Sequence, residues 1–178
     1  MKTVKTYSKG SKLLHWVMAL ILISMLFLGL SMVQSLATWQ IEAVELHKSL
    51  GVLAMILVIV RLVNRVFSAS PSLPIELPKW QKKLAYSSHV ALYGAMLLMP
   101  FSGWLMQSAD GRNVSVFGWV SLPQIVDANI NSYALFRELH GLIAWLFMAM
   151  IFMHIGAALY HGLIRQDGVL SSMLYGKR

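Results

Sequence analysis

The sequence predicts an all-α membrane protein in which four transmembrane helices form one bundle. Its 178 residues are 57% hydrophobic and only 12% charged, whereas a soluble domain usually carries about 25% charged residues. The apolar residues gather in four runs, at residues 13–33, 46–66, 84–106 and 139–164. Each run approaches or exceeds the ~20 residues that a helix needs to cross the hydrocarbon core. Backbone groups within lipid must hydrogen-bond internally, so each run is expected to be helical.

The first run, residues 13–33, follows a basic segment and could be read as a signal peptide. It is longer than the usual apolar signal core of about 7–15 residues, so we expect it to remain as a membrane helix. The connections between the runs are short, and the longest of them, residues 107–138, leaves no room for a soluble domain. Residues 1–178 are therefore expected to form a single membrane domain.

The distribution of basic residues indicates how the helices are oriented. One set lies before the first run, between the second and third runs, and at the end of the fourth: Lys2, Lys5, Lys9, Lys12, Arg65, Lys79, Lys82, Lys83, Arg165, Lys177 and Arg178. The two opposite connections and adjoining helix ends contain only Lys48, Arg112 and Arg137. Because basic residues stay on the cytoplasmic side, both termini are expected in the cytoplasm. Topology thus explains the net charge of +8, and no nucleic-acid partner is expected.

The chemistry of the chain is expected to depend on histidine. The sequence contains no cysteine, which excludes disulfides, thiolate zinc sites, iron–sulfur clusters and covalent c-type haem attachment. Six histidines lie within or at the ends of the four runs: His15, His47, His89, His140, His154 and His161. Ionisable side chains within a membrane are costly and usually functional. By contrast, no Asp or Glu lies deep inside a run, which counts against a haem-free proton-coupled or zinc transporter.

The spacing of two histidines in the fourth run predicts two haem sites. His154 follows His140 by fourteen residues, so the two lie on nearly the same helix face and ~21 Å apart along the axis. That spacing suits one haem towards each membrane surface. His47 begins the second run on the outer side, and His15 lies near the cytoplasmic start of the first. We therefore predict two haem b groups, an outer one between His47 and His140 and an inner one between His15 and His154.

Two residues at the same spacing are candidates for contact with the haems. Gly29 follows His15 by fourteen residues, and its lack of a side chain would let a macrocycle approach the backbone at the outer level. Ordinary helix packing is the alternative. Arg61 follows His47 by fourteen residues, and a haem propionate would neutralise it at the inner level. Snorkelling to the cytoplasmic headgroups is the alternative for Arg61.

The remaining histidines, His89 and His161, lie near the cytoplasmic side. His161 follows His154 by seven residues, which places it on nearly the same face and ~10 Å nearer to the cytoplasm. A quinone headgroup needs hydrogen-bond donors beside an apolar channel. His161, His89, Lys9 and Ser8 are our candidates for these donors, and an ordinary interfacial position is the alternative for both histidines.

Several motifs accompany the histidines in register: Tyr7-Ser8-Lys9, Trp16, Gly51, Arg61-Leu62, Arg65, Tyr93, Pro100 and Gly103. With the histidines, they resemble the bacterial cytochrome b561 family over nearly the whole chain. The resemblance implies a four-helix bundle with two bis-histidine b haems and a quinone-reactive site at the cytoplasmic end. The positions that match the haem ligands are the two pairs predicted above. The positions that match the quinone site are Ser8, Lys9, His89 and His161.

The resemblance also implies an activity, that of a quinone-reactive oxidoreductase in the bacterial inner membrane. Members similar to this chain are superoxide oxidases, which take an electron from periplasmic superoxide and pass it to ubiquinone. Lys48, Arg112 and Arg137 could steer superoxide to the outer haem, and orientation or loop solvation is their alternative role. The second hypothesis is an electron-carrying subunit, like the similar cytochromes of formate dehydrogenases and hydrogenases. Its donor would be a partner redox protein.

Overall fold

The computed structural model describes residues 6–34, 36–69, 71 and 77–174. Its elements in chain order are α1 (Lys9–Gln34), α2 (Trp39–Phe67), α3 (Lys79–Ala109), β1 (Val114–Val116), β2 (Val120–Leu122), α4 (Ile130–Leu159), the π-helical segment η1 (Tyr160–Arg165) and α5 (Val169–Leu174). The helices α1, α2 and α3, and α4 continued by η1, are each long and apolar enough to cross a membrane. The predicted all-α fold with four spans is thus confirmed.

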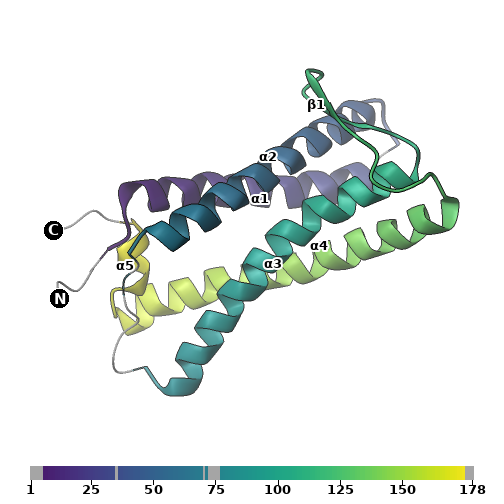
Figure 1. The fold of residues 1–178 in the computed structure, drawn as a ribbon. Helices are drawn as coiled ribbons and strands as arrows, with labels where there is room; N and C mark the ends of the chain where they lie inside the picture. Colours follow the sequence, from purple (N-terminus) through teal and green to yellow (C-terminus); the bar gives the residue numbers. More distant parts are fainter. Residues whose placement is uncertain (1–5, 35, 70, 72–76, 175–178) are drawn as a thin grey trace.

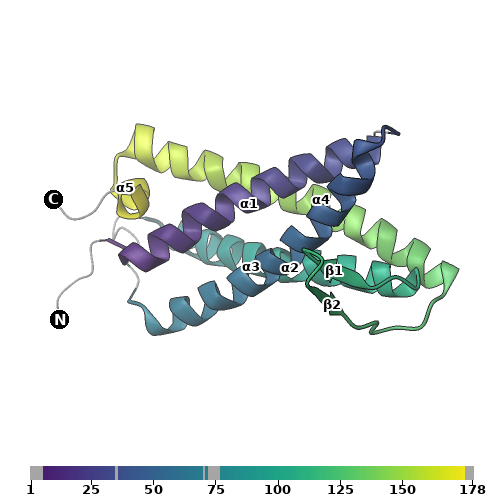
Figure 2. The same ribbon diagram turned by 90° about the horizontal axis from the view of Figure 1, so that it is seen from above.

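The four long helices alternate in direction and pack as two antiparallel pairs, α1 with α2 and α3 with α4 (Figures 1 and 2). Contacts between α2 and α3 join the pairs, whereas α4 has little close backbone contact with α1 or α2. One end of the bundle holds the strands β1 and β2 and is called the hairpin end here. The opposite end holds α5 and the start of α1 and is called the α5 end (Figure 1). Among the basic residues used to predict orientation, Lys2, Lys5, Lys177 and Arg178 lie outside the described residues.

Apolar side chains cover the outside of the bundle, as expected where lipid is the solvent. Leu20 is 70% exposed and Phe152 is 64% exposed, although both are large and apolar. A water-facing bundle would instead turn such residues inward. The few fully enclosed side chains between the helices include Val58 of α2 and Phe147 of α4.

The long helices extend beyond the apolar runs that predicted them. α4 begins at Ile130 rather than at residue 139, because Asn129 caps it by accepting hydrogen bonds from the backbone N–H groups of Asn131 and Ser132. Polar residues can continue a helix outside the hydrocarbon core, and hydropathy does not detect them. The connection predicted at 107–138 therefore shrinks to the segment between Ala109 and Ile130.

A small antiparallel hairpin fills much of that shorter connection. Val114 pairs with Leu122 and Val116 with Val120, and the turn contains Phe117 and Gly118, both with positive φ. Two successive positive φ angles are typical of the type I′ turn that suits a hairpin. The buried Ser49 of α2 attaches the hairpin, because its Oγ accepts a 2.9 Å hydrogen bond from the backbone N–H of Phe117. The hairpin therefore covers α2 at the level of the neighbouring His47.

Candidate metal centres

Four of the six histidines meet in two pairs across the bundle. The rings of His47 on α2 and His140 on α4 have centroids 6.3 Å apart, and those of His15 on α1 and His154 on α4 have centroids 6.2 Å apart. A metal–nitrogen bond of about 2.0–2.1 Å, plus about 1.1 Å from nitrogen to ring centroid, places two imidazoles on one metal roughly 6.3 Å apart. Both pairs therefore have the ring separation expected of two imidazoles that would hold one metal ion between them. Among the described residues, no group of three or more His, Asp or Glu could hold a metal ion.

A cavity of about 620 Å³ adjoins the pair at the hairpin end. Its wall includes His47 and His140, together with Gly51, Gly103 and Phe147. Its volume falls within the range of about 300–1,000 Å³ that is usual for cofactor pockets. The cavity therefore has the size and the donor atoms for a haem-sized group.

Two polar atoms in this wall lack a partner. They are Nδ1 of His47 and Oε1 of Gln107, the two buried side-chain atoms without a hydrogen bond in the part of the chain that the structure describes. Leaving such a group unpaired costs about 1–3 kcal/mol, and each case needs an explanation in a native structure. A polar ligand within the cavity would supply one.

The orientation of the His140 ring is set by its neighbours on α3. Ser102 donates its hydroxyl proton to the carbonyl of Met99 at 2.8 Å, so its oxygen accepts from Nδ1 of His140 at 2.9 Å. This bond leaves Nε2 of His140 free to bind a metal, as second-shell partners of metal-bound histidines do. A Cβ on Gly103 would lie only 3.2 Å from Cε1 of His140, so this glycine makes room for the ring.

Gly29 has a comparable position on the other side of the same pair. A Cβ at this residue would lie 3.4 Å from Cε1 of His47. The sequence predicted that Gly29 leaves space at the outer level, and the structure places it against the imidazole of His47. A side chain of one carbon would make only an ordinary van der Waals contact with this ring, so ordinary helix packing also fits Gly29.

At the α5 end, Arg61 contacts His15 rather than extending to the helix surface. Its Nη2 donates to Nδ1 of His15 at 2.9 Å, and its Nε donates to the hydroxyl of Tyr93 at 3.0 Å. The guanidinium therefore points into the bundle, which disfavours the snorkelling alternative. Because Nδ1 of His15 accepts this bond, the proton of the neutral ring lies on Nε2.

A third imidazole joins the inner pair. The ring of His89 on α3 lies 5.7 Å from that of His154, so His154 has a histidine neighbour on both α1 and α3. The sequence assigned His89 to the quinone site, and the structure brings it next to a predicted haem ligand. Ring separation alone does not distinguish His15 from His89 as the partner of His154.

The charges around the outer cavity are more balanced than the basic residues alone suggested. Three basic and two acidic side chains line it: Lys48, Arg112, Arg137, Asp110 and Glu138. Arg112 pairs with Asp110 at 2.6 Å, and Lys48 pairs with Glu45 at 2.5 Å. Sequence reasoning missed these acidic partners, although each lies only two or three residues from its base. The wall keeps a small positive excess.

The four residues proposed for a quinone site share the α5 end but differ in their local roles. Ser8 caps α1, since its Oγ accepts from the backbone N–H of Ser11 at 3.2 Å, and Lys9 is exposed. His161 lies in η1 and contacts Asp167 at 2.6 Å. Among the described residues, no hydrogen bond, ion pair or ring contact joins any two of the four.

Comparison with known proteins identifies relatives that match most of the chain. The family model described as prokaryotic cytochrome b561 matches residues 6–176. Cytochrome b561 homolog 2 of Escherichia coli K12 is 37% identical over 176 residues, which cover 97% of this chain and 93% of that protein. Cytochrome b561 homolog 1 of the same organism is 31% identical over 130 residues, or 73% of each chain.

Proposed function

This chain belongs to the prokaryotic cytochrome b561 family, and we propose that it passes electrons from superoxide at the hairpin end to a quinone at the α5 end. Membership makes it a multi-pass bacterial membrane protein of a family that binds haem b and transfers electrons. The proposal adds two haems per chain, one for each histidine pair. It also adds an inner-membrane location with the α5 end in the cytoplasm.

His47 and His140 are the proposed ligands of the outer haem b. Their ring separation of 6.3 Å supports this assignment, as does the adjoining cavity of about 620 Å³ with its two unpaired polar atoms. Ser102 keeps Nε2 of His140 available for the iron. Lys48, whose side chain is 13% exposed, and the amide N–H of Gln107 line the same cavity and are the candidates to donate hydrogen bonds to propionates.

His15 and His154 are the proposed ligands of the inner haem b, with Arg61 as the partner of an anionic propionate. The 6.2 Å ring separation repeats that of the outer pair. We choose His15 over His89 because the position of His15 matches a haem ligand of the cytochrome b561 family. Iron binding at Nε2 would require Arg61 to release Nδ1, and an anionic propionate would take up its guanidinium. His89 then remains for the quinone.

When bound, each haem b supplies one-electron redox chemistry at its iron. The residues of the chain determine how each haem would be held and how far apart the two sites lie. Two histidines at each site would hold the haem iron, and this would favour electron transfer over oxygen binding. Because His140 and His154 belong to one continuous helix, α4 holds the two sites ~21 Å apart along its axis.

Superoxide is the proposed donor because the outer cavity, whose wall includes Val114 of the hairpin, has a small positive excess. Arg137 is the wall cation without an ion pair in the described part of the chain, and it would attract a small anion. Two superoxide anions, one quinone and two protons give two molecules of oxygen and one quinol. At the α5 end, His161, His89 and Lys9 are the donors proposed for the quinone, and Ser8 already uses its Oγ to cap α1.

The observation that carries this function is the presence of one histidine pair towards each end of α4, because electrons crossing a membrane need a site near both faces. The experiment uses the purified chain, superoxide generated in solution and a soluble ubiquinone analogue. We expect quinol formation that requires the chain and disappears when superoxide dismutase is added. A rate equal to that without the protein would contradict superoxide as the donor.

A second candidate is an electron-carrying subunit that receives electrons from a partner protein. One observation favours it: the hairpin beside the cavity exposes 89% of Trp119 and 61% of Val120, an apolar surface that a partner could cover. The two candidates differ in one measurable respect. A subunit would bind haem but would reduce no quinone when supplied with superoxide alone.

A pair of glycine substitutions tests the proposed outer site. In Gly103→Ala, the new Cβ would lie 3.2 Å from His140, so the ring must move, and overpacking of this kind typically costs about 1–3 kcal/mol. We expect retention of the outer haem to weaken by roughly tenfold or more, measured as haem absorbance after extended detergent washing. Gly94→Ala is the matched control in α3, because a Cβ there meets nothing within 4 Å. Equal haem retention by both variants would contradict the proposed site.

A further inference from the structure

The end of the fourth span turns back on the bundle through an irregular segment. After α4, the chain forms the π-helical η1, and then Gln166 and Gly168 adopt positive φ angles of 51° and 86°. A non-glycine residue in this region is uncommon, and π-helical turns occur frequently at functional sites. The short helix α5 follows and lies against α1, where Trp16 donates from its indole N–H to the carbonyl of Met173 at 3.4 Å.

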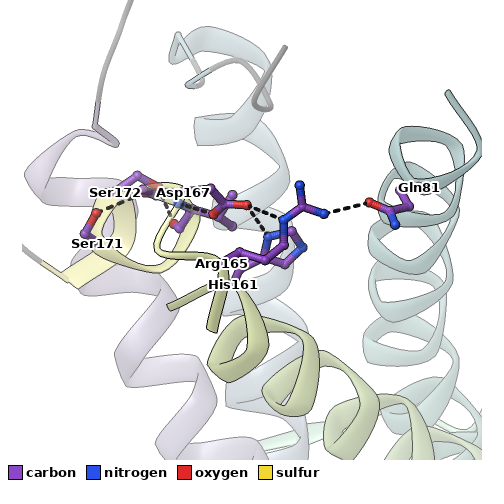
Figure 3. A network of polar contacts seen from close by, with 8 residues as sticks. Gln81, His161, Arg165, Asp167, Ser171 and Ser172 are labelled. Atoms are coloured by element: carbon purple, nitrogen blue, oxygen red, sulfur yellow. Dashed lines mark hydrogen bonds and ion pairs between the residues drawn. The ribbon is translucent and has the colours of Figure 1, made fainter. Parts of the chain in front are cut away.

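This reversal of the chain places the carboxylate of Asp167 beside the imidazole of His161. Oδ2 of Asp167 lies 2.6 Å from Nδ1 of the imidazole, and Oδ1 accepts from the backbone N–H of Val169 at 3.3 Å. Arg165 lies 3.6 Å from the same Oδ2 and also donates to Oε1 of Gln81 on α3 at 3.4 Å (Figure 3). One carboxylate oxygen of Asp167 therefore faces the side chains of His161 and Arg165, and the other bonds to the backbone at the start of α5.

Both side chains of this contact are largely enclosed. The side chain of His161 is 22% exposed and that of Asp167 is 13% exposed. A charge-assisted hydrogen bond in such a place is stronger than one on the open surface. Since Asp167 holds Nδ1, the imidazole cannot turn freely, and Nε2 is the nitrogen left for another partner.

We infer that Asp167 is a positioning residue for quinone reduction, which holds His161 by Nδ1 so that Nε2 meets a quinone carbonyl. The inference rests on the proposed function, because it requires a quinone at the α5 end. Asp167 itself touches no substrate in this scheme and acts through His161 alone.

The reduction of a quinone requires protons as well as electrons, and this explains why His161 needs Asp167 as a partner. A quinone becomes a quinol by taking up two electrons and two protons, and the proposed donor supplies the electrons only. With Nδ1 held by Asp167, a proton on Nε2 faces the quinone carbonyl. Nε2 donates first a hydrogen bond and then its proton to the quinone oxygen, and water at the α5 end restores it.

The competing interpretation is that Asp167 only supports the start of α5 through Val169. Asp167→Asn separates the two interpretations, because asparagine keeps an oxygen for the backbone N–H of Val169 but removes the negative charge at His161. Two control variants accompany it. Glu42→Gln removes an exposed carboxylate at the hairpin end, and Ser171→Ala removes the 3.1 Å hydrogen bond from Oγ to the carbonyl of Gly168 in α5.

The test follows two half-reactions in the purified, haem-loaded chain: reduction by superoxide and reoxidation by a soluble ubiquinone analogue. We expect Asp167→Asn to slow reoxidation about tenfold or more and to leave reduction unchanged. His161→Gln should slow reoxidation at least as much. Adding Asp167→Asn to His161→Gln should then have no further effect, because a residue that acts only through another is not additive with it.

A binding measurement provides the second readout. The quinone analogue should raise the melting temperature of the parent chain and of both controls, and this rise should be smaller for Asp167→Asn. Normal reoxidation by Asp167→Asn beside slow His161→Gln would overturn the inference and leave the quinone site intact. Additive losses in the double variant, or equal losses in both half-reactions, would also overturn it. Normal reoxidation by both variants would overturn it together with the role proposed for His161.

Discussion

His140→Ala is expected to leave about one haem b per chain where the unmodified protein holds about two. Alanine removes one of the two imidazoles whose rings lie 6.3 Å apart at the outer cavity, and the described structure offers no third histidine there. The inner pair is unaffected, because His154 lies fourteen residues further along α4. Haem extraction and pyridine haemochrome quantification of the purified variant measure the loss.

The matched control for this variant is His161→Ala, which removes a histidine from the same span but from neither pair. It should retain about two haems. His47→Ala should reproduce the result of His140→Ala, since both rings belong to one site. If His140→Ala kept the full haem content, or if it lost all haem while remaining folded, the assignment of one site to each pair would be wrong.

At the α5 end, the expected result depends on which of two neighbours shares the iron with His154. His154→Ala should remove the inner haem, because it eliminates the ring that lies within 6.2 Å of His15 and 5.7 Å of His89. His15→Ala should remove the same haem, whereas His89→Ala should keep it and impair reoxidation by quinone. Haem content and reduced-minus-oxidised spectra of the three variants measure the outcome.

The comparison of His15→Ala with His89→Ala decides which of the two histidines shares the inner haem with His154. Loss of haem in His89→Ala but not in His15→Ala would mean that α3, not α1, supplies the second ligand. The quinone assignment of His89 would then also fail. Loss in both variants would indicate that one ring ligates iron and that the other maintains the site, and Arg61→Lys would help to separate the two roles. Lysine keeps the charge but loses the fork that holds His15 and Tyr93 together.

The four spans could be predicted from sequence because the energetic requirement of a membrane is simple. A run of ~20 apolar residues has few alternatives to a helix in lipid. The ends of the helices could not be predicted in the same way, because Asn129 and Ile130 lie where hydropathy is uninformative. Asn129 itself carries a cap signal, since asparagine is favoured before a helix, and this signal would have moved the predicted start of α4.

The irregular elements at the two ends were not predicted because they depend on contacts between distant residues. The hairpin is held by Ser49, whose hydroxyl bonds to Phe117 on a segment far along the chain. The segment after η1 is joined to α1 by the indole N–H of Trp16, which bonds to Met173 at the far end of the chain. Neither contact is accompanied by a hydrophobic periodicity or a change of composition that sequence analysis could detect.

The histidine pairing followed from the fourteen-residue spacing, and the structure brings the predicted pairs within reach of one iron. What spacing could not predict was the environment of each ring. The bond from Ser102 to His140 and the close approach of Gly103 depend on how α3 packs against α4. The position of His89 beside His154 depends on the same packing. The face of a helix on which a residue lies can be calculated from the spacing along that helix. The side chains that contact the residue from other helices can be known only from the packing of the whole bundle.

The measurement that tests the central claim most directly is the number of b haems in the purified, unmodified chain from haem-replete cells. Haem extraction against protein mass, with a reduced-minus-oxidised spectrum, should give about two low-spin b haems per chain, each with two axial nitrogens. A ratio of one haem per chain, or a colourless folded protein, would contradict the account of one iron site towards each end of α4.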